Sequence, residues 1–366
     1  MKLSFNRNDL LKAINIVNKA VSSGTTMPIL KCILLDASSD EIILIGNDME
    51  LSIETSVPGT VLERGRVALD ARLFSEIVRK LPDSDVEINT DDRLITNIKC
   101  GKAVYNIPGQ DAEDFPYPPI IEEENVLSVS QLSLKEMINQ TLFSINANEN
   151  NKLMTGELFE IRNNTFRIVA LDGHRIALRK LELAGEYADL KAVVPGKTLS
   201  EVSKILSDEL DQPVSMCFSS NQLMFEFDET KVFTRLIEGE YFHIDNMISS
   251  DYQTKVVINK KEFYECIDRA SLLIREGDNK PIVFTVEDGQ IELDINTTSG
   301  SMNESLEIEK EGMDIKIGFN PKFLTEPLRV IDDETISLYM INSKAPCFIK
   351  NDEGTYLYLI LPVNIL

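Results

Sequence analysis

The residues that most resemble catalytic machinery form one run in the middle of the chain, Ala170-Leu171-Asp172-Gly173-His174-Arg175. An imidazole between a carboxylate and a guanidinium could act as a general acid or base. The chain has one other histidine, His243, and no serine or cysteine stands in a nucleophile-elbow context. Asp-Gly followed by a polar residue is also typical of a tight turn between two strands. We interpret the run as a turn and predict no catalytic residue.

Other residues with chemical potential lack the partners that their chemistry needs. Gly196-Lys197-Thr198 has the end of a phosphate loop without its upstream glycine, and it predicts a strand-to-helix turn. Two distant histidines give no set of metal ligands, so we expect neither a metal nor a cofactor. The cysteines are odd in number and scattered, which favours reduced thiols packed in the core of a cytoplasmic protein. They are Cys32, Cys100, Cys217, Cys266 and Cys347.

A helical signature occurs three times, starting at Phe74, Leu199 and Leu324, so the copies lie 125 residues apart. In each copy, apolar residues at helical spacing form one face and basic residues stand on the other. The period is too long for a solenoid repeat and matches one ordinary domain. With linkers at the proline-rich segment 114–119 and near 248–251, we predict three tandem domains over residues 1–121, 122–248 and 249–366.

Each third of the chain predicts the same α+β domain, in which two helices pack on one side of an antiparallel sheet. The expected order is β-α-β-β-β-α-β-β-β-β. The predicted helices span residues 8–20, 72–81, 132–145, 196–207, 259–275 and 320–331. Ser133 is the expected N-cap of the third helix. Pro327 conflicts with the last helix unless it lies in the early turns that follow Pro321.

The charge of the chain is unevenly distributed. The formal net charge is −23, which would repel nucleic acid from the surface as a whole. The predicted helices, however, carry a net charge of +6, so that the remainder carries −29. Basic helices that face phosphates explain this distribution, and acidic loops that keep a protein in solution explain it equally well. Without tryptophan or a basic-aromatic platform, any DNA contact is expected to be to the backbone.

Domain size gives the tandem repeat a geometric meaning. A domain of this length has a diameter of roughly 35 Å. Three such domains in a closed ring leave a hole of only about 6 Å, whereas six leave about 35 Å, which is ample for a DNA duplex. Two copies joined head to tail would supply six domains. No apolar run near the amino end has signal-peptide length, and none reaches the ~18 residues that span a membrane, so we expect a cytoplasmic protein without a membrane partner.

Six segments, in order and spacing, make the chain similar to the bacterial sliding clamps, the beta subunits of DNA polymerase III, over essentially its whole length. They are Met27-Pro28-Ile29-Leu30, Gly46-Asn47-Asp48-Met49-Glu50, Asp114-Phe115-Pro116, the Ala170–Arg175 run, Ile317-Gly318-Phe319-Asn320 and Leu361-Pro362. The resemblance implies a homodimeric, non-catalytic ring with the DNA clamp fold. A clamp loader would place it on double-stranded DNA, where it would tether the polymerase III alpha subunit and other proteins with a clamp-binding motif.

The resemblance also implies three sets of site residues. A pocket for a short peptide, roughly Gln-Leu-x-Leu-Phe, would be lined by Met154, Thr155, Leu171, His174, Arg175, Ile176, Phe242, Met247, Pro346, Leu359, Leu361, Pro362 and Val363. The dimer edge would pair Tyr105 and Ile107 with Leu272 and Leu273, for which ordinary core packing is the alternative. The candidates for DNA contact, each of which could instead be a solvated helix residue, are Lys12, Arg72, Arg79, Lys135, Lys197, Lys204, Lys322 and Arg329.

Two segments depart from the family pattern. Gly24-Thr25-Thr26 stands where the family commonly has an arginine, so one DNA-backbone contact is expected to be missing. Tyr241-Phe242-His243-Ile244, followed by Asn246, makes the predicted pocket rim bulkier and less basic than in the family. The rival interpretations are an enzyme built around His174 and a non-replicative scaffold or paralogue with the clamp fold.

Overall fold

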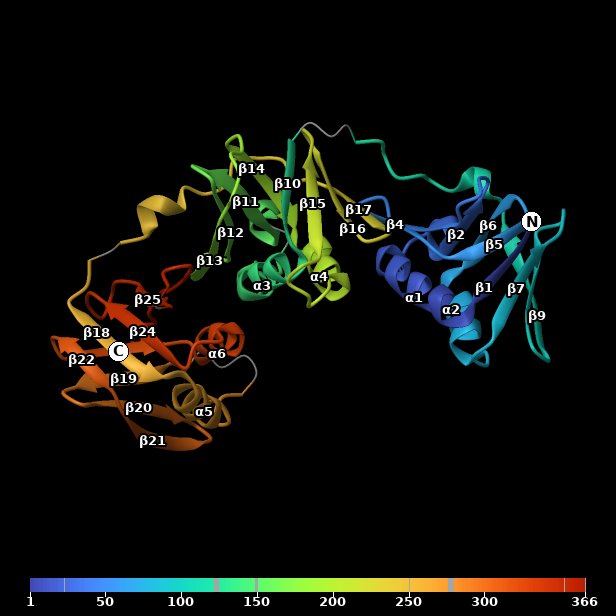
Figure 1. Ribbon diagram of the computed structural model, residues 1–366. Coiled ribbons are helices and arrows are strands. Elements are labelled where there is room, and N and C mark those ends of the chain that lie inside the picture. The colour runs from blue at the N-terminus through green and yellow to red at the C-terminus, as the bar shows by residue number, and fades with distance from the viewer. Residues whose placement is uncertain are drawn as a thin grey trace. The chain divides into compact units, whose positions relative to one another are not determined.

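The structure of the protein is a computed structural model that describes residues 1–22, 24–121, 125–148, 151–249, 251–275, 280–351 and 353–365 (Figure 1). The chain forms two compact units. Unit 1 comprises Met1–Lys135 with Glu201–Leu236, and unit 2 comprises Glu136–Ser200 with Ile237–Leu366. The predicted domain boundaries stay predictions, and linker residues 122–124 and 250 lie outside the described residues.

Unit 1 contains an antiparallel sheet of thirteen described strands in the order β10-β15-β16-β17-β4-β3-β2-β6-β9-β8-β7-β1-β5. The strands of the first third are β1 (Lys2–Asn6), β2 (Cys32–Ala37), β3 (Ile43–Asn47), β4 (Leu51–Ser56), β5 (Gly59–Glu63), β6 (Gly65–Asp70), β7 (Asp85–Thr90), β8 (Ile95–Cys100) and β9 (Ala103–Gln110). Those of the second are β10 (Asn125–Ser130), β15 (Pro213–Phe218), β16 (Gln222–Phe227) and β17 (Thr230–Arg235). The pairing of β17 with β4 therefore joins the first third of the chain to the second.

Unit 2 contains two antiparallel sheets among the residues described. The larger has the order β14-β11-β12-β13-β26-β25-β24-β18-β22, and the smaller has the order β21-β20-β19-β23. The strands are β11 (Gly156–Arg162), β12 (Thr165–Leu171), β13 (Arg175–Glu182), β14 (Leu190–Pro195), β18 (Thr254–Asn259), β19 (Ile282–Glu287), β20 (Gln290–Thr297), β21 (Gly300–Glu307), β22 (Glu309–Gly312), β23 (Ile315–Phe319), β24 (Thr335–Met340), β25 (Cys347–Lys350) and β26 (Tyr356–Ile360). Here the pairing of β13 with β26 joins the second third of the chain to the third.

A helix forms in each of the six predicted windows. They are α1 (Arg7–Val17), α2 (Ala71–Lys80), α3 (Gln131–Thr141), α4 (Gly196–Ile205), α5 (Lys260–Ser271) and α6 (Pro321–Val330). Side-chain caps begin several of them, since the Asp70 carboxylate accepts the Leu73 N–H and the Asn259 amide oxygen accepts the Glu262 N–H. The prediction of Ser133 as an N-cap was wrong. Helix α3 begins at Gln131, and the Ser130 hydroxyl accepts the Ser133 N–H at 3.3 Å.

The fold confirms the α+β class but corrects the predicted strand order. Four or five strands lie between the two helices of each third, and three follow the second helix. The predicted order has three strands between the helices and four after the second helix, so it gives too few strands before each second helix and one too many after it. The strands directly before the second helices are β6, β14 and β23. The ends of these strands are buried continuously instead of alternating with exposed residues, so they lack the period of two that marks a half-buried strand.

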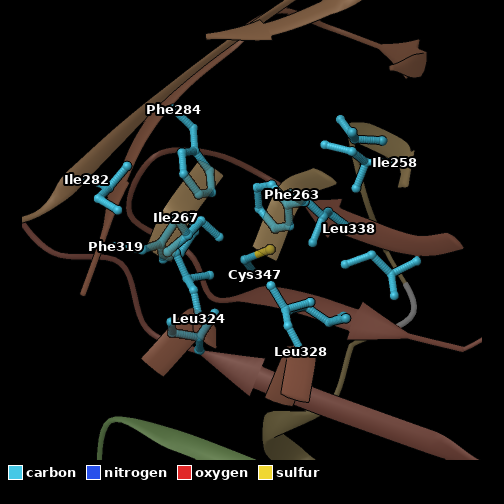
Figure 2. Close-up of a cluster of buried hydrophobic side chains, with 14 of the residues drawn as sticks. Ile258, Phe263, Ile267, Ile282, Phe284, Phe319, Leu324, Leu328, Leu338 and Cys347 are labelled. Carbon is cyan, nitrogen blue, oxygen red and sulfur yellow. The ribbon is translucent and has the colours of Figure 1, made fainter. Parts of the chain in front are cut away.

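The apolar faces of the helices pack on the sheets, as the core of the C-terminal third shows (Figure 2). Phe263 and Ile267 of α5, with Leu324 and Leu328 of α6, gather with strand residues such as Phe284. All five side chains are at most 2% exposed. Since full burial of one such side chain contributes about 1.5–3 kcal/mol, the spacing of apolar residues in the repeated signature fixes which helix face meets the sheet.

The same turn occurs at both places where a sheet of one third of the chain pairs with the next third. After β3, Asp48 Oδ1 accepts the N–H groups of Glu50 and Leu51 at 3.1 and 2.8 Å. After β12, Asp172 Oδ1 accepts the N–H groups of His174 and Arg175 at 2.9 and 3.2 Å. Both turns lead into a strand that pairs with the last strand of the next third. The enzyme-like sequence run is thus one copy of a repeated structural turn.

Candidate functional site

Arg175 lies beneath the candidate partner surface, and its side chain is buried and bonded to groups inside the protein. It is 5% exposed. Its Nε donates to Asp172 Oδ2 at 2.9 Å, Nη2 donates to the Phe143 carbonyl at 2.6 Å, and Nη1 donates to the Glu326 carboxylate. Burial would lower the pKa of Arg175, but Tyr358, Glu326 and Asp172 raise it, so that the guanidinium stays charged. Arg175 therefore ties β13 to α6 and to the helical turn Leu142–Ser144.

Aromatic rings complete this cluster. The guanidinium carbon of Arg175 lies 4.3 Å from the centroid of the Phe323 ring, within the range of a cation–π contact. The His174 ring stacks on the same phenyl ring, with centroids 6.0 Å apart. The position of His174 is therefore fixed by an aromatic contact. The position of Asp172 is fixed by its turn and by its ion pair with Arg175. This arrangement supports a binding surface and not acid–base chemistry.

Pro327 lies in the interior of α6, which overturns its predicted placement in the early turns. Because proline has no N–H, the carbonyl of Phe323 loses its helical donor. The hydroxyl of Tyr358 on β26 donates to this carbonyl at 2.6 Å and replaces the missing bond. The sequence conflict is thus resolved by a tertiary contact directly beside the Arg175 cluster.

An apolar cluster in unit 2 gathers part of the predicted peptide pocket. Leu171, Ile176 and Leu359 are at most 5% exposed and form its buried part, with Met154 and Phe242 packed against it. The other predicted pocket residues that reach solvent are half-buried (Thr155, Pro346, Pro362, Val363) or exposed (His174, Met247, Leu361). The structure thus divides the predicted set into a buried floor and an accessible rim.

The carboxyl-terminal tail is held against the same region by backbone hydrogen bonds. The Leu361 N–H donates to the His174 carbonyl at 2.9 Å, and the Val363 N–H donates to the Gly318 carbonyl at 2.8 Å. Leu361 remains 39% exposed and Met247 49% exposed. These apolar side chains are accessible to a partner and need no rearrangement of the backbone.

A buried carboxyl group lies next to this surface. Glu157 on β11 is 0% exposed, and neither of its carboxyl oxygens has a hydrogen-bond partner. Burial raises its pKa to about 8. The nearby Thr141 hydroxyl offsets this little, because it donates to the Met137 carbonyl at 2.8 Å. Burial, and then the proximity of Glu157, also raise the pKa of Tyr241, the neighbour of Phe242.

The predicted DNA-contact residues lie on five of the six described helices, since α5 carries none of them, and their charges are used differently. Lys135 pairs with Asp208 at 2.6 Å, Lys204 with Glu201 at 2.7 Å and Arg72 with Glu76 at 3.3 Å. The Arg329 Nε donates to the Tyr264 hydroxyl at 2.9 Å. The remaining candidates are exposed: Lys12, Arg79, Lys197 and Lys322. Neighbouring acids therefore partly neutralise the predicted basic face.

Two strand edges correspond to the predicted dimer contacts. Strand β9 pairs with β8 along its length, but with β6 only at Gly109 and Gln110, which leaves its other edge open at Tyr105. Strand β21 is the end strand of its sheet. Tyr105 is 40% exposed and Leu272, just after α5, is 83% exposed. Ile107 is buried in its own unit, and Leu273 is half-buried against the C-terminal core.

Sequence reasoning missed the residues that hold the Arg175 cluster together. Phe143, Tyr358 and the pair Phe323 and Glu326 on α6 come from three separate segments, up to 215 positions apart. Glu326 belongs to the repeated helical signature, which gave it a place on a helix but no partner. The conflict at Pro327 was the one available signal, because a carbonyl without its donor requires a replacement.

Three further observations on the described residues concern metal binding, the cysteines and membrane spans. Within them, no group of His, Cys, Asp or Glu side chains could hold a metal ion. All five cysteines are buried, and none of them forms a disulfide within the part of the chain that the structure describes. Of the helices described, none is long and apolar enough to cross a membrane.

Three family models match the chain in succession. They describe the DNA polymerase III beta subunit: its N-terminal domain matches residues 1–119, its central domain 128–243 and its C-terminal domain 246–364. Among curated relatives, the beta sliding clamp of Bacillus subtilis is 36% identical over 378 residues, and that of Staphylococcus epidermidis is 34% identical over 378 residues. These alignments cover 100% of this chain and at least 99% of each relative.

Solved structures of similar proteins agree with this fold. A putative DNA polymerase III beta subunit from Eubacterium rectale is 58% identical, with a TM-score of 0.97 over 100% of this chain and 99% of that one. The DNA polymerase sliding clamp from Bacillus subtilis is 34% identical, with a TM-score of 0.96 over 100% of both chains.

Proposed function

The chain belongs to the DNA polymerase III beta subunit family, the beta sliding clamps, which are non-catalytic processivity factors, and on this premise we propose that two copies close into a ring around duplex DNA. The two open strand edges carry the proposal. An open edge presents unpaired N–H and C=O groups and is a template for pairing with another chain. In a head-to-tail dimer, β9 of one copy pairs with β21 of its partner, and Tyr105 and Leu272 are buried beside the joint. The dimer then has two such joints, so each copy pairs both of its open edges and the ring closes.

The proposed ring holds DNA by its topology and not by strong affinity. The helices α1 to α6 line the hole, where exposed residues such as Lys12, Arg79 and Lys322 attract phosphates without reading bases. Pairing of Lys135 and Lys204 with neighbouring carboxylates weakens the attraction further. A weak, sequence-independent contact of this kind lets the ring slide.

The partner surface of unit 2 binds a short peptide with apolar anchors. The floor of Leu171, Ile176 and Leu359 accepts the anchors, and the accessible rim around Met247 and Leu361 excludes water from them. Arg175 positions the floor because it fixes β13 against α6. The peptides come from the polymerase III alpha subunit, from the clamp loader and from other proteins with the same motif, all in the bacterial cytoplasm.

Retention on DNA at high salt tests the ring directly. The protein is loaded with a matched clamp loader and ATP onto a nicked circular plasmid and onto the same plasmid after linearisation. Salt screens phosphate contacts but cannot open a closed ring. We expect retention on the circle and run-off from the linear DNA. Equal loss from both forms would refute encirclement and would favour a scaffold that shares only the clamp fold.

A further inference from the structure

A cavity of about 330 Å³ lies in unit 2 between the carboxyl end of α6, α3 and residues just before β26, and none of its described lining residues belongs to the predicted peptide pocket. Carboxylates line it from three separate segments: Glu136 on α3, Asp332 and Asp333 after α6, and Glu353 before β26. Arg179 on β13 is the one cation among the described lining residues, and its guanidinium donates to the Thr355 hydroxyl. The lining therefore carries four negative charges and one positive charge.

Two buried side chains of the lining each have one polar atom without a hydrogen-bond partner. Gln140 is 8% exposed, and its Nε2 donates to the Val330 carbonyl at 3.1 Å, while its Oε1 accepts no hydrogen bond. Tyr356 is 2% exposed, and its hydroxyl also has no partner. An unpaired buried polar atom costs about 1–3 kcal/mol. Both atoms can accept hydrogen bonds, so the cavity calls for a ligand that brings donors and positive charge.

We propose that this cavity binds an organic polycation with several ammonium groups, of the polyamine class. Each ammonium group offers three N–H donors and a positive charge, which suits both the unpaired acceptors and the carboxylates. A bare divalent cation suits the cavity less. Within the described residues no group of three or more His, Cys, Asp or Glu side chains could hold a metal ion, and the volume equals roughly ten water molecules at about 30 Å³ each.

A polycation bound in this cavity affects the link between α3 and α6 and the charge near both helices. Helix α3 comes from the central third and α6 from the C-terminal third, and the Gln140 amide already links them through the Val330 carbonyl. A polycation between Glu136 and Asp332 adds a second link across the same joint. It also neutralises negative charge close to helices that carry candidate DNA contacts such as Lys322. The site thereby favours both a rigid joint and phosphate approach.

Isothermal titration calorimetry with spermidine tests the proposal on the full chain without DNA, so its outcome is independent of ring loading. At 150 mM NaCl we expect one saturable site per chain. The variant Glu136→Gln/Asp332→Asn removes two lining charges and should raise Kd at least tenfold. The matched control Glu113→Gln/Asp92→Asn makes the same changes at exposed positions of unit 1 and should leave Kd within twofold. Equal weakening in both variants, or no saturation, would overturn the site.

Two further arms test the chemistry of the ligand. Tyr356→Phe deletes the unpaired hydroxyl, so it should weaken spermidine binding at least threefold without lowering the melting temperature of the ligand-free protein. An unchanged Kd in this variant would remove the hydroxyl from the site and overturn the assignment. MgCl2 at equal ionic strength should displace little spermidine. One-to-one binding of Mg²⁺ that depends on the same carboxylates would replace the polyamine with a metal ion and refute the proposed class.

Discussion

Replacement of Glu157 by glutamine should stabilise the protein at neutral pH but not at acidic pH. Burial raises the pKa of Glu157 to about 8 from an ordinary value of 4.5. Below pH 4.5 the carboxyl group is protonated in both the folded and the unfolded chain, so it imposes no penalty. As the pH rises towards 8, the unfolded chain releases the proton while the folded chain keeps it. The free energy of unfolding therefore falls with rising pH.

The magnitude follows from the separation of the two pKa values. Each pH unit between them costs about 1.4 kcal/mol, so the penalty at pH 7 is about 3 kcal/mol relative to pH 4.5. Glutamine has nearly the same shape and does not ionise, so Glu157→Gln should abolish this pH dependence. Urea unfolding followed by far-UV circular dichroism, at pH 5 and at pH 7.5, measures the difference between the variant and the original chain.

The control is Glu186→Gln, since Glu186 is exposed in the same unit and should show no comparable effect. We expect the advantage of Glu157→Gln over the original chain to grow by about 3 kcal/mol between pH 5 and pH 7.5. An advantage that stays constant across this range would show that the carboxyl group ionises in the folded protein. That result would refute the reasoning from burial.

Three other perturbations test the remaining surfaces. Leu272→Asp should disrupt the dimer, because the loss of about 1.5–3 kcal/mol at each of two joints raises Kd by roughly 10²–10⁴; sedimentation velocity measures this, with the exposed Leu210→Asp as control. Joint neutralisation of Lys12, Arg79 and Lys322 should lower the slope of log K against log salt by about three, whereas neutralisation of the exposed Lys2, Lys102 and Lys344 should not. Tyr358→Phe leaves the Phe323 carbonyl without its donor and should cost about 1–3 kcal/mol in urea unfolding. The cost should shrink in a Pro327→Ala background, where the residue-327 N–H returns, and an equal cost in both backgrounds would contradict the role given to Tyr358.

Local pattern was sufficient to predict the helices. The repeated signature placed α2, α4 and α6, because apolar residues at a spacing of three or four define a buried face whatever lies beneath it. It gave too few strands before each second helix, where the buried ends of β6, β14 and β23 carry no alternation. The strand edges were predicted only through the resemblance and not from local pattern, because a free edge is a property of the whole sheet.

The candidate sites divide in the same way. The basic residues on the helices could be anticipated from the sequence, because each depends on a single element, whereas Leu272 was named only through the resemblance. The partners of Arg175 could not, because Phe143, Glu326 and Phe323 approach it only when β13, the turn after α3 and α6 have packed together. The unpaired acceptors of Gln140 and Tyr356 are likewise invisible until burial removes water from them.

The sequence by itself determined the threefold repeat, the six helices and the family, since spacing and residue type along the chain are local and cumulative. Only the tertiary structure decided that the His174 turn repeats the turn at Asp48, that Tyr358 satisfies the carbonyl left free by Pro327, and that Glu157 keeps its proton. Each of these depends on which groups exclude water from one another, and that is decided by contacts between segments far apart in the chain.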